Sequence, residues 1–405
     1  MWQVVRRYWQ DGRGAMTLVE QLWQAVPGLQ SAIVRQPLVQ DREQAWVLLR
    51  QLMLAHAPTT GVTLPGAIFD QVTDIAASFG LADRLGPHLA GTGSPGLWVG
   101  VEKEWADLIV VAHLDRPTFR VSMLHGPHTA TLSPVDGPGR AFTSSAARAL
   151  RYDPDVRKLR VVARGRVRLV EGAAPPALLF ETDSGAVSAL DMILLELPPV
   201  REGALVHGSG LDNCAGVLAA LGAAAILREV EEVLVEQNRR CLFVFSGRQS
   251  VLPETIGLRG SASAAVPPSL GMVVVDVLTA GHGTPVPLGE GTCFAFAEER
   301  EGGLLVPPHY RRLTQDLAQA LVGWPLSVKA RRFQGMPSHS QYNTNNPAQI
   351  VSLTGPPIQT TPSGGETMHL GDLQTAVKWL ACLLPIVLNL VPAITVRYAL
   401  GHQVG

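Results

Sequence analysis

Acid and imidazole groups stand where buried strands end and where a buried helix begins. His113 and Asp115 follow the apolar segment LIVVA. Asp212 lies at the start of the small-residue run LDNCAGVLAALGAAAIL, and Asp276 follows MVVV. Open α/β folds collect their chemistry at the carboxyl edge of the sheet. One imidazole and two carboxylates that meet there suit a divalent metal, zinc in particular, and Asp115 suits a partner that fixes the tautomer of His113.

Asp212 also has a simpler interpretation. Aspartate at a helix start accepts hydrogen bonds from free backbone N–H groups and interacts favourably with the helix dipole. The residues alone leave both interpretations open, a helix cap or a metal ligand.

Three kinds of segment must position these groups. Apolar residues at three-and-four spacing predict helices within residues 15–56 and over 67–81. Between 117 and 207, short alternating stretches broken by Gly and Pro predict a small β-barrel. From 208 onward strands and helices alternate again, up to a final helix from 371. The pattern predicts an α/β fold, a helix-flanked sheet interrupted by a β-domain.

Composition excludes several classes of protein. The chain has 405 residues, of which 46% are hydrophobic and 17% charged, so it can bury a large core and is not disordered. A net charge of −1 and the lack of a basic stripe argue against a nucleic-acid partner. Four widely spaced cysteines predict reduced core residues of a cytoplasmic protein, and the N-terminal sequence has no stretch typical of a secretion signal.

One segment approaches the length of a membrane span. Residues 379–396, WLACLLPIVLNLVPAITV, contain Pro385, Asn389 and Pro392 and continue an ordinary helical pattern. We expect a buried C-terminal helix and no membrane partner, with a membrane-tethered protein as the alternative.

The order of these pieces resembles a known family. HLD after a strand, a β-insert, GLDNCAG, ETIGLRGSASAA and VVVDVLTAGHGTPVPLGEG together resemble the dinuclear-metal aminopeptidases of the glutamyl-aminopeptidase and deblocking-aminopeptidase family. The likeness covers roughly residues 50–390. It implies a three-layer helix-sheet-helix metallopeptidase domain with an inserted small β-barrel domain, and by analogy a homo-oligomer.

The resemblance also implies roles for individual residues. His113, Asp212 and Asp276 match the family's ligands for one metal, with Asp212 as the bridging ligand, and Asp115 matches the residue that supports the first ligand. In an ungapped alignment Glu254 matches the general base. The cofactor implied is a divalent metal, zinc with cobalt or manganese as alternatives, one or two per chain.

The second metal site departs from the family's pattern. Thr255 stands where the family has a glutamate ligand, and Pro362 stands where it has a histidine. If the preceding loop contains an insertion, Ser250 and Val251 replace both glutamates, and the general base is then lost as well. Three residues are candidate substitutes for the missing histidine, His369 or Glu366 nearby in the sequence, or His339 from the segment PSHSQY. Asn213 stands where a second acidic residue is usual.

Two hypotheses about function follow. The first is a cytoplasmic metallo-aminopeptidase, a hydrolase that removes N-terminal residues from short peptides with metal-activated water. The second is a non-catalytic homologue, a pseudoenzyme that keeps the fold for peptide binding or assembly. In either case we expect an N-terminal helical extension (1–44), an α/β peptidase-like domain (45–116 and 208–405) and an inserted β-domain of the oligomerisation type (117–207).

Overall fold

The computed structural model describes most of the chain. It covers residues 18–59, 61–86, 95–103, 106–135, 144–170, 177–247, 270–279, 287–295, 306–322, 324, 328–332, 350–360 and 365–390. Several residues singled out above lie outside these ranges, namely Ser250, Val251, Glu254, Thr255, His339 and Pro362.

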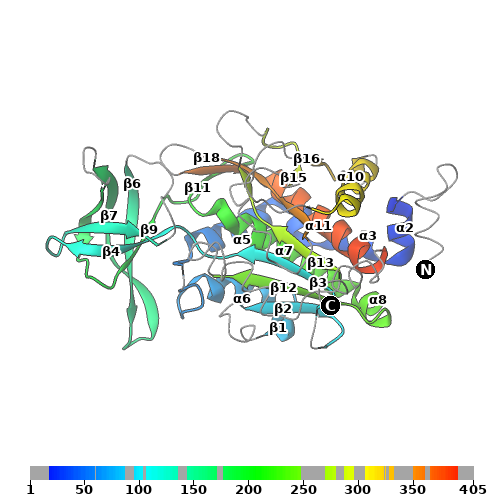
Figure 1. The fold of residues 1–405 in the computed structure, drawn as a ribbon, viewed down its shortest axis with the longest axis horizontal. Coiled ribbons are helices and arrows are strands. Elements are labelled where there is room, and N and C mark those ends of the chain that lie inside the picture. Colours follow the sequence, from blue (N-terminus) through cyan, green and yellow to red (C-terminus); the bar gives the residue numbers. More distant parts are fainter. Residues whose placement is uncertain are drawn as a thin grey trace, which may run out of the picture.

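A mixed eight-stranded sheet forms the centre of the larger domain (Figure 1). Its strand order is β1-β2-β12-β3-β13-β17-β15-β16. The inner strands β12, β3, β13 and β17 are parallel, and β2 and β15 run antiparallel to their inner neighbours. The bounds are β1 (Leu85–Gly86), β2 (Gly96–Gly100), β3 (Leu108–His113), β12 (Arg240–Ser246), β13 (Gly271–Val275), β15 (Thr292–Ala295), β16 (Ala330–Arg332) and β17 (Ile350–Gly355).

The inner strands are near-continuous apolar runs because helices cover the sheet. Two long helices, α7 and α11, lie side by side against it. The helices are α2 (Leu18–Ala25), α3 (Leu29–Arg35), α4 (Pro37–Gln40), α5 (Arg42–Leu54), α6 (Ile68–Ser78), the 3-10 turn η1 (Ala82–Arg84), α7 (Leu211–Glu229), α8 (Glu231–Glu236), α10 (Pro308–Val322) and α11 (Leu370–Leu390).

The first helices belong to this same core. Leu22, Leu29 and Leu38 of α2, α3 and α4 are fully buried in the cluster of apolar side chains that contains the sheet. Trp23 of α2 stacks on Trp324, which follows α10, with ring centroids 4.0 Å apart. The N-terminal segment therefore packs on the α/β domain as an added part of its helix layer.

A second sheet and a closed barrel also occur in the described part of the chain. The five-stranded sheet has the order β10-β11-β19-β18-β14, and the barrel has the order β4-β5-β8-β7-β6-β9. The sheet contains β10 (Val200–Glu202), β11 (Leu205–Gly208), β14 (Leu278–Thr279), β18 (Pro357–Thr360) and β19 (Glu366–His369). The barrel contains β4 (Thr118–Leu124), β5 (Thr129–Pro134), β6 (Ser144–Asp153), β7 (Lys158–Val170), β8 (Ala177–Gly185) and β9 (Met192–Leu195).

The barrel has its own apolar core, which includes Phe119, Val167 and Phe180. These observations confirm the expected α/β class with a small β-barrel. The strands at 200–202 and 205–208, which the sequence placed in the β-domain, instead form a sheet with β19, because β11 pairs antiparallel with that distant strand.

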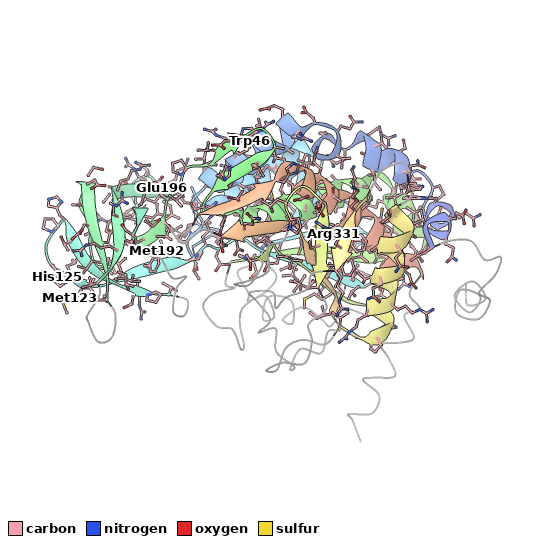
Figure 2. The ribbon with its side chains drawn as sticks, turned by 90° about the horizontal axis from the view of Figure 1, so that it is seen from above. Trp46, Met123, His125, Met192, Glu196 and Arg331 are labelled. Atoms are coloured by element: carbon pink, nitrogen blue, oxygen red, sulfur yellow. The ribbon has the colours of Figure 1, made fainter. Side chains whose placement is uncertain are left out.

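The barrel contacts the C-terminal end of α5. Arg148 of β6 is buried and donates hydrogen bonds to the carbonyl oxygens of Leu54 and Ala55, and it pairs with Glu196. Figure 2 shows Glu196 on the side of the barrel that faces the α/β domain, whereas Met123 and His125 lie at the far end. Burial lowers the pKa of Arg148 to about 10, so the side chain stays charged at neutral pH.

Within the part of the chain that the structure describes, two helices are long and apolar enough to cross a membrane, Leu211–Glu229 and Leu370–Asn389. In their most apolar windows, 94% and 78% of the residues are buried inside the protein. An all-round apolar helix enclosed by protein is a core helix. The described part of the segment 379–396 is therefore core, as expected for a buried C-terminal helix.

Close packing of α7 predicts the effect of a substitution at Gly222. A Cβ there would lie 2.8 Å from Leu38 Cδ1 and 3.0 Å from Val377 Cγ1, on the neighbouring helices α4 and α11. We expect Gly222→Val to lower the free energy of unfolding by about 1–3 kcal/mol through overpacking. Thermal and urea unfolding followed by circular dichroism measure the change. The control, Val235→Ala on the exposed side of α8, should stay within about 0.5 kcal/mol of the parent. An unchanged Gly222→Val protein would contradict the packing described.

Candidate metal site

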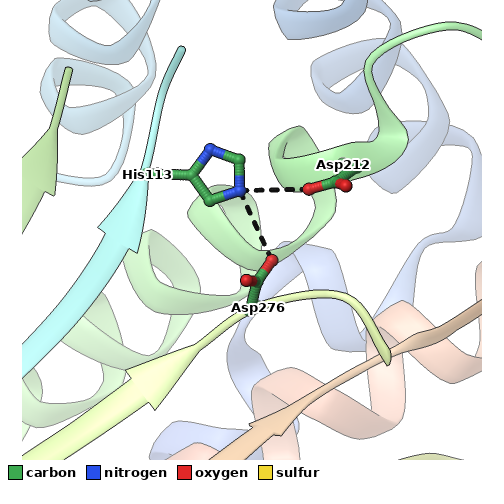
Figure 3. A group of neighbouring side chains, drawn as sticks. All are labelled: His113, Asp212 and Asp276. Atoms are coloured by element: carbon green, nitrogen blue, oxygen red, sulfur yellow. Dashed lines mark hydrogen bonds and ion pairs between the residues drawn. The ribbon is translucent and has the colours of Figure 1, made fainter. Parts of the chain in front are cut away.

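Three candidate ligands meet at the carboxyl edge of the central sheet. His113 ends β3, and Asp276 directly follows β13, its parallel neighbour. Asp212 comes from the first turn of α7. Figure 3 shows the three side chains pointing toward one another. His113 Nε2 lies 3.0 Å from Asp212 Oδ1 and 3.4 Å from Asp276 Oδ1.

The start of α7 distinguishes the two interpretations of Asp212. Gly210 occupies the N-cap position, with a φ of 88°. Asp212 and Asn213 have non-helical backbone dihedrals, and the peptide bond between them is cis. These dihedrals interrupt the first turn of the helix. The Asp212 carboxylate is directed at His113, 3.0 Å from its Nε2, which favours a ligand over a cap.

Backbone contacts hold the two carboxylates in place. The Asp212 N–H donates to Glu366 Oε2 at 3.1 Å, and Glu366 is itself buried on β19. Asp276 Oδ1 accepts a hydrogen bond from the Val277 N–H at 2.8 Å. Asn213 Nδ2 donates to the carbonyl oxygen of Val275 at 2.9 Å, which ties the first turn of α7 to the end of β13. Asn213, at the position where the family described above usually has a second acidic residue, thus has a structural partner here.

Asp115 fixes the orientation of the imidazole. His113 Nδ1 lies 3.0 Å from the backbone oxygen of Asp115 and 3.7 Å from its Oδ1. A proton on Nδ1 is held by these oxygens, so Nε2 is the nitrogen directed at the two facing carboxylates.

Burial and the neighbouring carboxylates have opposite effects on the pKa of His113. Burial lowers the pKa of the imidazole, but the charge of Asp276 and the hydrogen bonds to the three nearby carboxylates raise it well above 6.5. The carboxylates therefore favour a positive charge beside Nε2 of His113. A divalent cation carries a larger positive charge than the proton that it would replace.

The donor set fits a divalent metal ion. One imidazole nitrogen and two carboxylate oxygens lie within 4.8 Å of one another, all from buried residues, and no other such trio occurs in the described ranges. Catalytic zinc sites use three protein ligands and leave one position for water. Carboxylate oxygen and imidazole nitrogen also suit cobalt and manganese.

The possible substitutes for the second site fall in different places. The carboxylate of Glu366 accepts the Asp212 N–H and so lies beside the trio. The described contacts of His369 are with other residues: its Nδ1 accepts a hydrogen bond from the Gly371 N–H, and its ring approaches Gly289. The other positions discussed for the second site and for the general base lie outside the described residues.

One buried residue at the site was not singled out from the sequence. Arg116, which directly follows the HLD motif, hydrogen-bonds to Cys214 Sγ, two residues after Asp212. The sequence shows a basic residue directly after the ligand motif, but no spacing in it indicates the partners of that side chain.

Comparisons with known proteins concern the fold. No family model matches the chain, and no curated protein sequence matches it. Among solved structures, an aminopeptidase from the archaeon Desulfurococcus kamchatkensis has a TM-score of 0.66 at 17% identity, over 90% of this chain and 99% of that one. A TET aminopeptidase from a marine sediment thaumarchaeote has a TM-score of 0.63 at 12% identity, over 88% and 99%. The TET1 peptidase of Pyrococcus horikoshii, which can assemble into a tetrahedron or a large octahedral shell, has a TM-score of 0.58 at 16% identity, over 84% and 98%.

At these identities the likeness shows the fold. The chain has the fold of these aminopeptidases along nearly their whole length, and its activity has to be argued from the site.

The raised pKa of His113 predicts a pH dependence of metal affinity. A metal ion must displace the proton on Nε2, so below that pKa the apparent affinity should fall about tenfold per pH unit for the one proton released. Competition with a chelator for Co²⁺ at several pH values, together with proton release in weakly buffered solution, measures this. An affinity independent of pH, with no proton released, would exclude His113 as a ligand.

Proposed function

We propose that this protein is a metal-dependent aminopeptidase-like hydrolase that removes N-terminal residues from short peptides. The observation that supports the proposal best is the buried trio His113, Asp212 and Asp276, at the carboxyl edge of a sheet with the fold of aminopeptidases. One imidazole and two carboxylates would hold a divalent ion, zinc with cobalt or manganese as alternatives. When bound, such an ion lowers the pKa of water and polarises a carbonyl group.

The residues of the chain would have three roles in this reaction, namely metal binding, orientation of the imidazole and proton transfer. His113, Asp212 and Asp276 would hold the ion. The resemblance assigns Asp212 the role of the bridging ligand. Asp115 keeps Nε2 of His113 available by binding Nδ1. Glu254, which the resemblance aligns with the family's general base, would take the proton of the attacking water and return it to the leaving amine.

Assembly and location are part of the same proposal. We expect a homo-oligomer, because the TET1 peptidase of Pyrococcus horikoshii, which is similar in fold, can assemble into a tetrahedron or a large octahedral shell. The four cysteines are free and buried, which suits a cytoplasmic protein. Light scattering coupled to size exclusion would detect an assembly of several copies.

Replacing the ligands tests the proposed activity. We expect His113→Ala and Asp212→Ala each to lower aminopeptidase turnover of short unblocked peptides by more than about a hundredfold, since loss of outer-shell partners alone costs about 10–100-fold. Peptide cleavage by the zinc- or cobalt-loaded protein and metal content by elemental analysis measure the effect. The control is His125→Ala, an exposed histidine on the barrel, which should match the parent.

Each outcome has a distinct meaning. Turnover that survives both ligand substitutions would exclude the metallo-aminopeptidase. A parent chain with one ion and turnover would be a one-metal hydrolase, and one with two ions would mean that other residues replace Thr255 and Pro362. A parent chain without turnover above a metal-stripped sample would favour the non-catalytic homologue.

Glu254 provides a separate test of the proton-transfer step. We expect Glu254→Gln to lower turnover about 10²–10⁴-fold, the usual contribution of a general base, because the amide cannot accept the proton. Metal content should stay at the parent's value. Turnover that stays unchanged would mean that the alignment contains the insertion and that another group accepts the proton.

A further inference from the structure

Arg116 joins the two segments that carry the candidate ligands. It lies three residues after His113 and is only 4% exposed. Its Nη1 donates to the carbonyl oxygen of Met53 at 2.8 Å, and its Nη2 donates to that of Leu52, also at 2.8 Å. Nη2 also donates to Cys214 Sγ at 3.3 Å. One guanidinium therefore connects the end of α5 to the first turn of α7.

The guanidinium also packs against the backbone that precedes Asp212. A Cβ on Gly210 would collide with the Cζ and Nε atoms of Arg116. Gly210 has a φ of +88°, a conformation that glycine adopts without steric cost. Arg116 thus contacts the residue two before Asp212 and the residue two after it.

The backbone of Arg116 is fixed as firmly as its side chain. Its N–H donates to the carbonyl oxygen of Ala57 at 2.9 Å. Its own carbonyl oxygen accepts hydrogen bonds from the hydroxyls of Thr59 and Thr118, at 3.1 and 2.8 Å. The segment that begins with His113 is thereby anchored behind the site.

We propose that Arg116 is a positioning residue that sets the affinity of the metal centre by holding Asp212 at its distance from His113. The inference rests on the proposed function, because it assumes that the trio binds a divalent ion. Arg116 contacts no ligand side chain in a described hydrogen bond and acts through Gly210 and Cys214.

The sign of the effect separates positioning from two other roles. A purely electrostatic influence would give tighter metal binding without Arg116, because a positive charge near a cation is removed. A purely structural role would lower stability and leave the affinity of the folded protein unchanged. Of the three roles, only positioning predicts that the folded variant binds the metal ion more weakly than the parent does.

The chain offers a matched control in Arg148. This arginine is buried to a similar extent, at 5% exposed, and it donates to the next two carbonyl oxygens at the same end of α5, those of Leu54 and Ala55. None of its described hydrogen bonds reaches residues 210–214. Arg148→Met removes the same kind of interaction as Arg116→Met, but not the contact with the Asp212 turn.

The experiment measures Co²⁺ affinity by chelator competition, the visible absorption of bound Co²⁺, and the thermal unfolding midpoint. We expect Arg116→Met to weaken Co²⁺ binding by about 10–100-fold and to change the Co²⁺ spectrum. Arg116→Lys should fall in between, because an ammonium lacks the planar fork. The Co²⁺ affinity of Arg148→Met should stay within about twofold of the parent value, even if its unfolding midpoint falls as far as that of Arg116→Met.

Gly210→Ala keeps the inference testable if Arg116→Met does not fold. The added Cβ displaces the guanidinium while the arginine stays in place, so we expect weaker Co²⁺ binding here too. In Arg116→Lys the same glycine substitution should weaken binding less, since the contact with the guanidinium is already lost.

Tighter or unchanged Co²⁺ binding in folded Arg116→Met or Gly210→Ala would overturn the inference, as would equal weakening in Arg148→Met. A parent chain that binds no Co²⁺ would instead overturn the proposed function and this inference with it. The two failures are distinguishable from the parent chain alone.

Discussion

The buried imidazole of His113, held between two carboxylates, is the interaction on which the site depends. Burying acidic groups costs free energy unless a cation compensates them. Asp212 and Asp276 are almost completely buried, and they face the same ring nitrogen. The protein tolerates this arrangement because His113 accepts a proton readily, and because its Nδ1 is bound to Asp115. The same balance of charge would favour a divalent ion in place of that proton. Stability of the site and its affinity for a cation therefore have one physical origin.

The placement of Asp212 requires helix α7 to approach the sheet and its neighbouring helices closely. Residues 211–227 of this helix are all buried, and many are alanine or glycine. Glycine at 222 lets α4 and α11 pack against the helix, and glycine at 216 leaves room for Asn213, which binds the end of β13. A helix built of larger residues would lie further from the sheet edge, and Asp212 would move away from His113. The run of small residues after Asp212 is thus part of what brings its carboxylate to the site.

The sequence predicted the parts of the fold that depend on local pattern. Apolar runs identified β3 and β13, and helical spacing identified α5 and α6, because burial on defined faces imposes these periods. The carboxyl ends of parallel strands share one edge, so the strand pattern alone predicts that His113 and Asp276 lie near each other. The pairing of β11 with β19 was not predictable in this way, since it joins residues about 160 positions apart and depends on the whole fold. Arg116 was missed for a similar reason. Its partners lie at the end of α5 and the start of α7, and no spacing in the sequence connects them.

Two buried arginines bind the C-terminal end of α5, Arg116 from the segment after β3 and Arg148 from the barrel. Its last carbonyl groups carry partial negative charge and need donors. Arg116 supplies them from the segment that carries His113, and Arg148 supplies them from the barrel. The two arginines use different acceptors at this helix end, Leu52 and Met53 for Arg116 and Leu54 and Ala55 for Arg148. Of the two, Arg116 is the one whose described contacts continue to the Asp212 turn, through Cys214 Sγ and Gly210. Because hydrogen bonds to a charged guanidinium are strong and directional, the position of this turn depends on the contacts of Arg116, whereas Arg148 holds the barrel to the same helix.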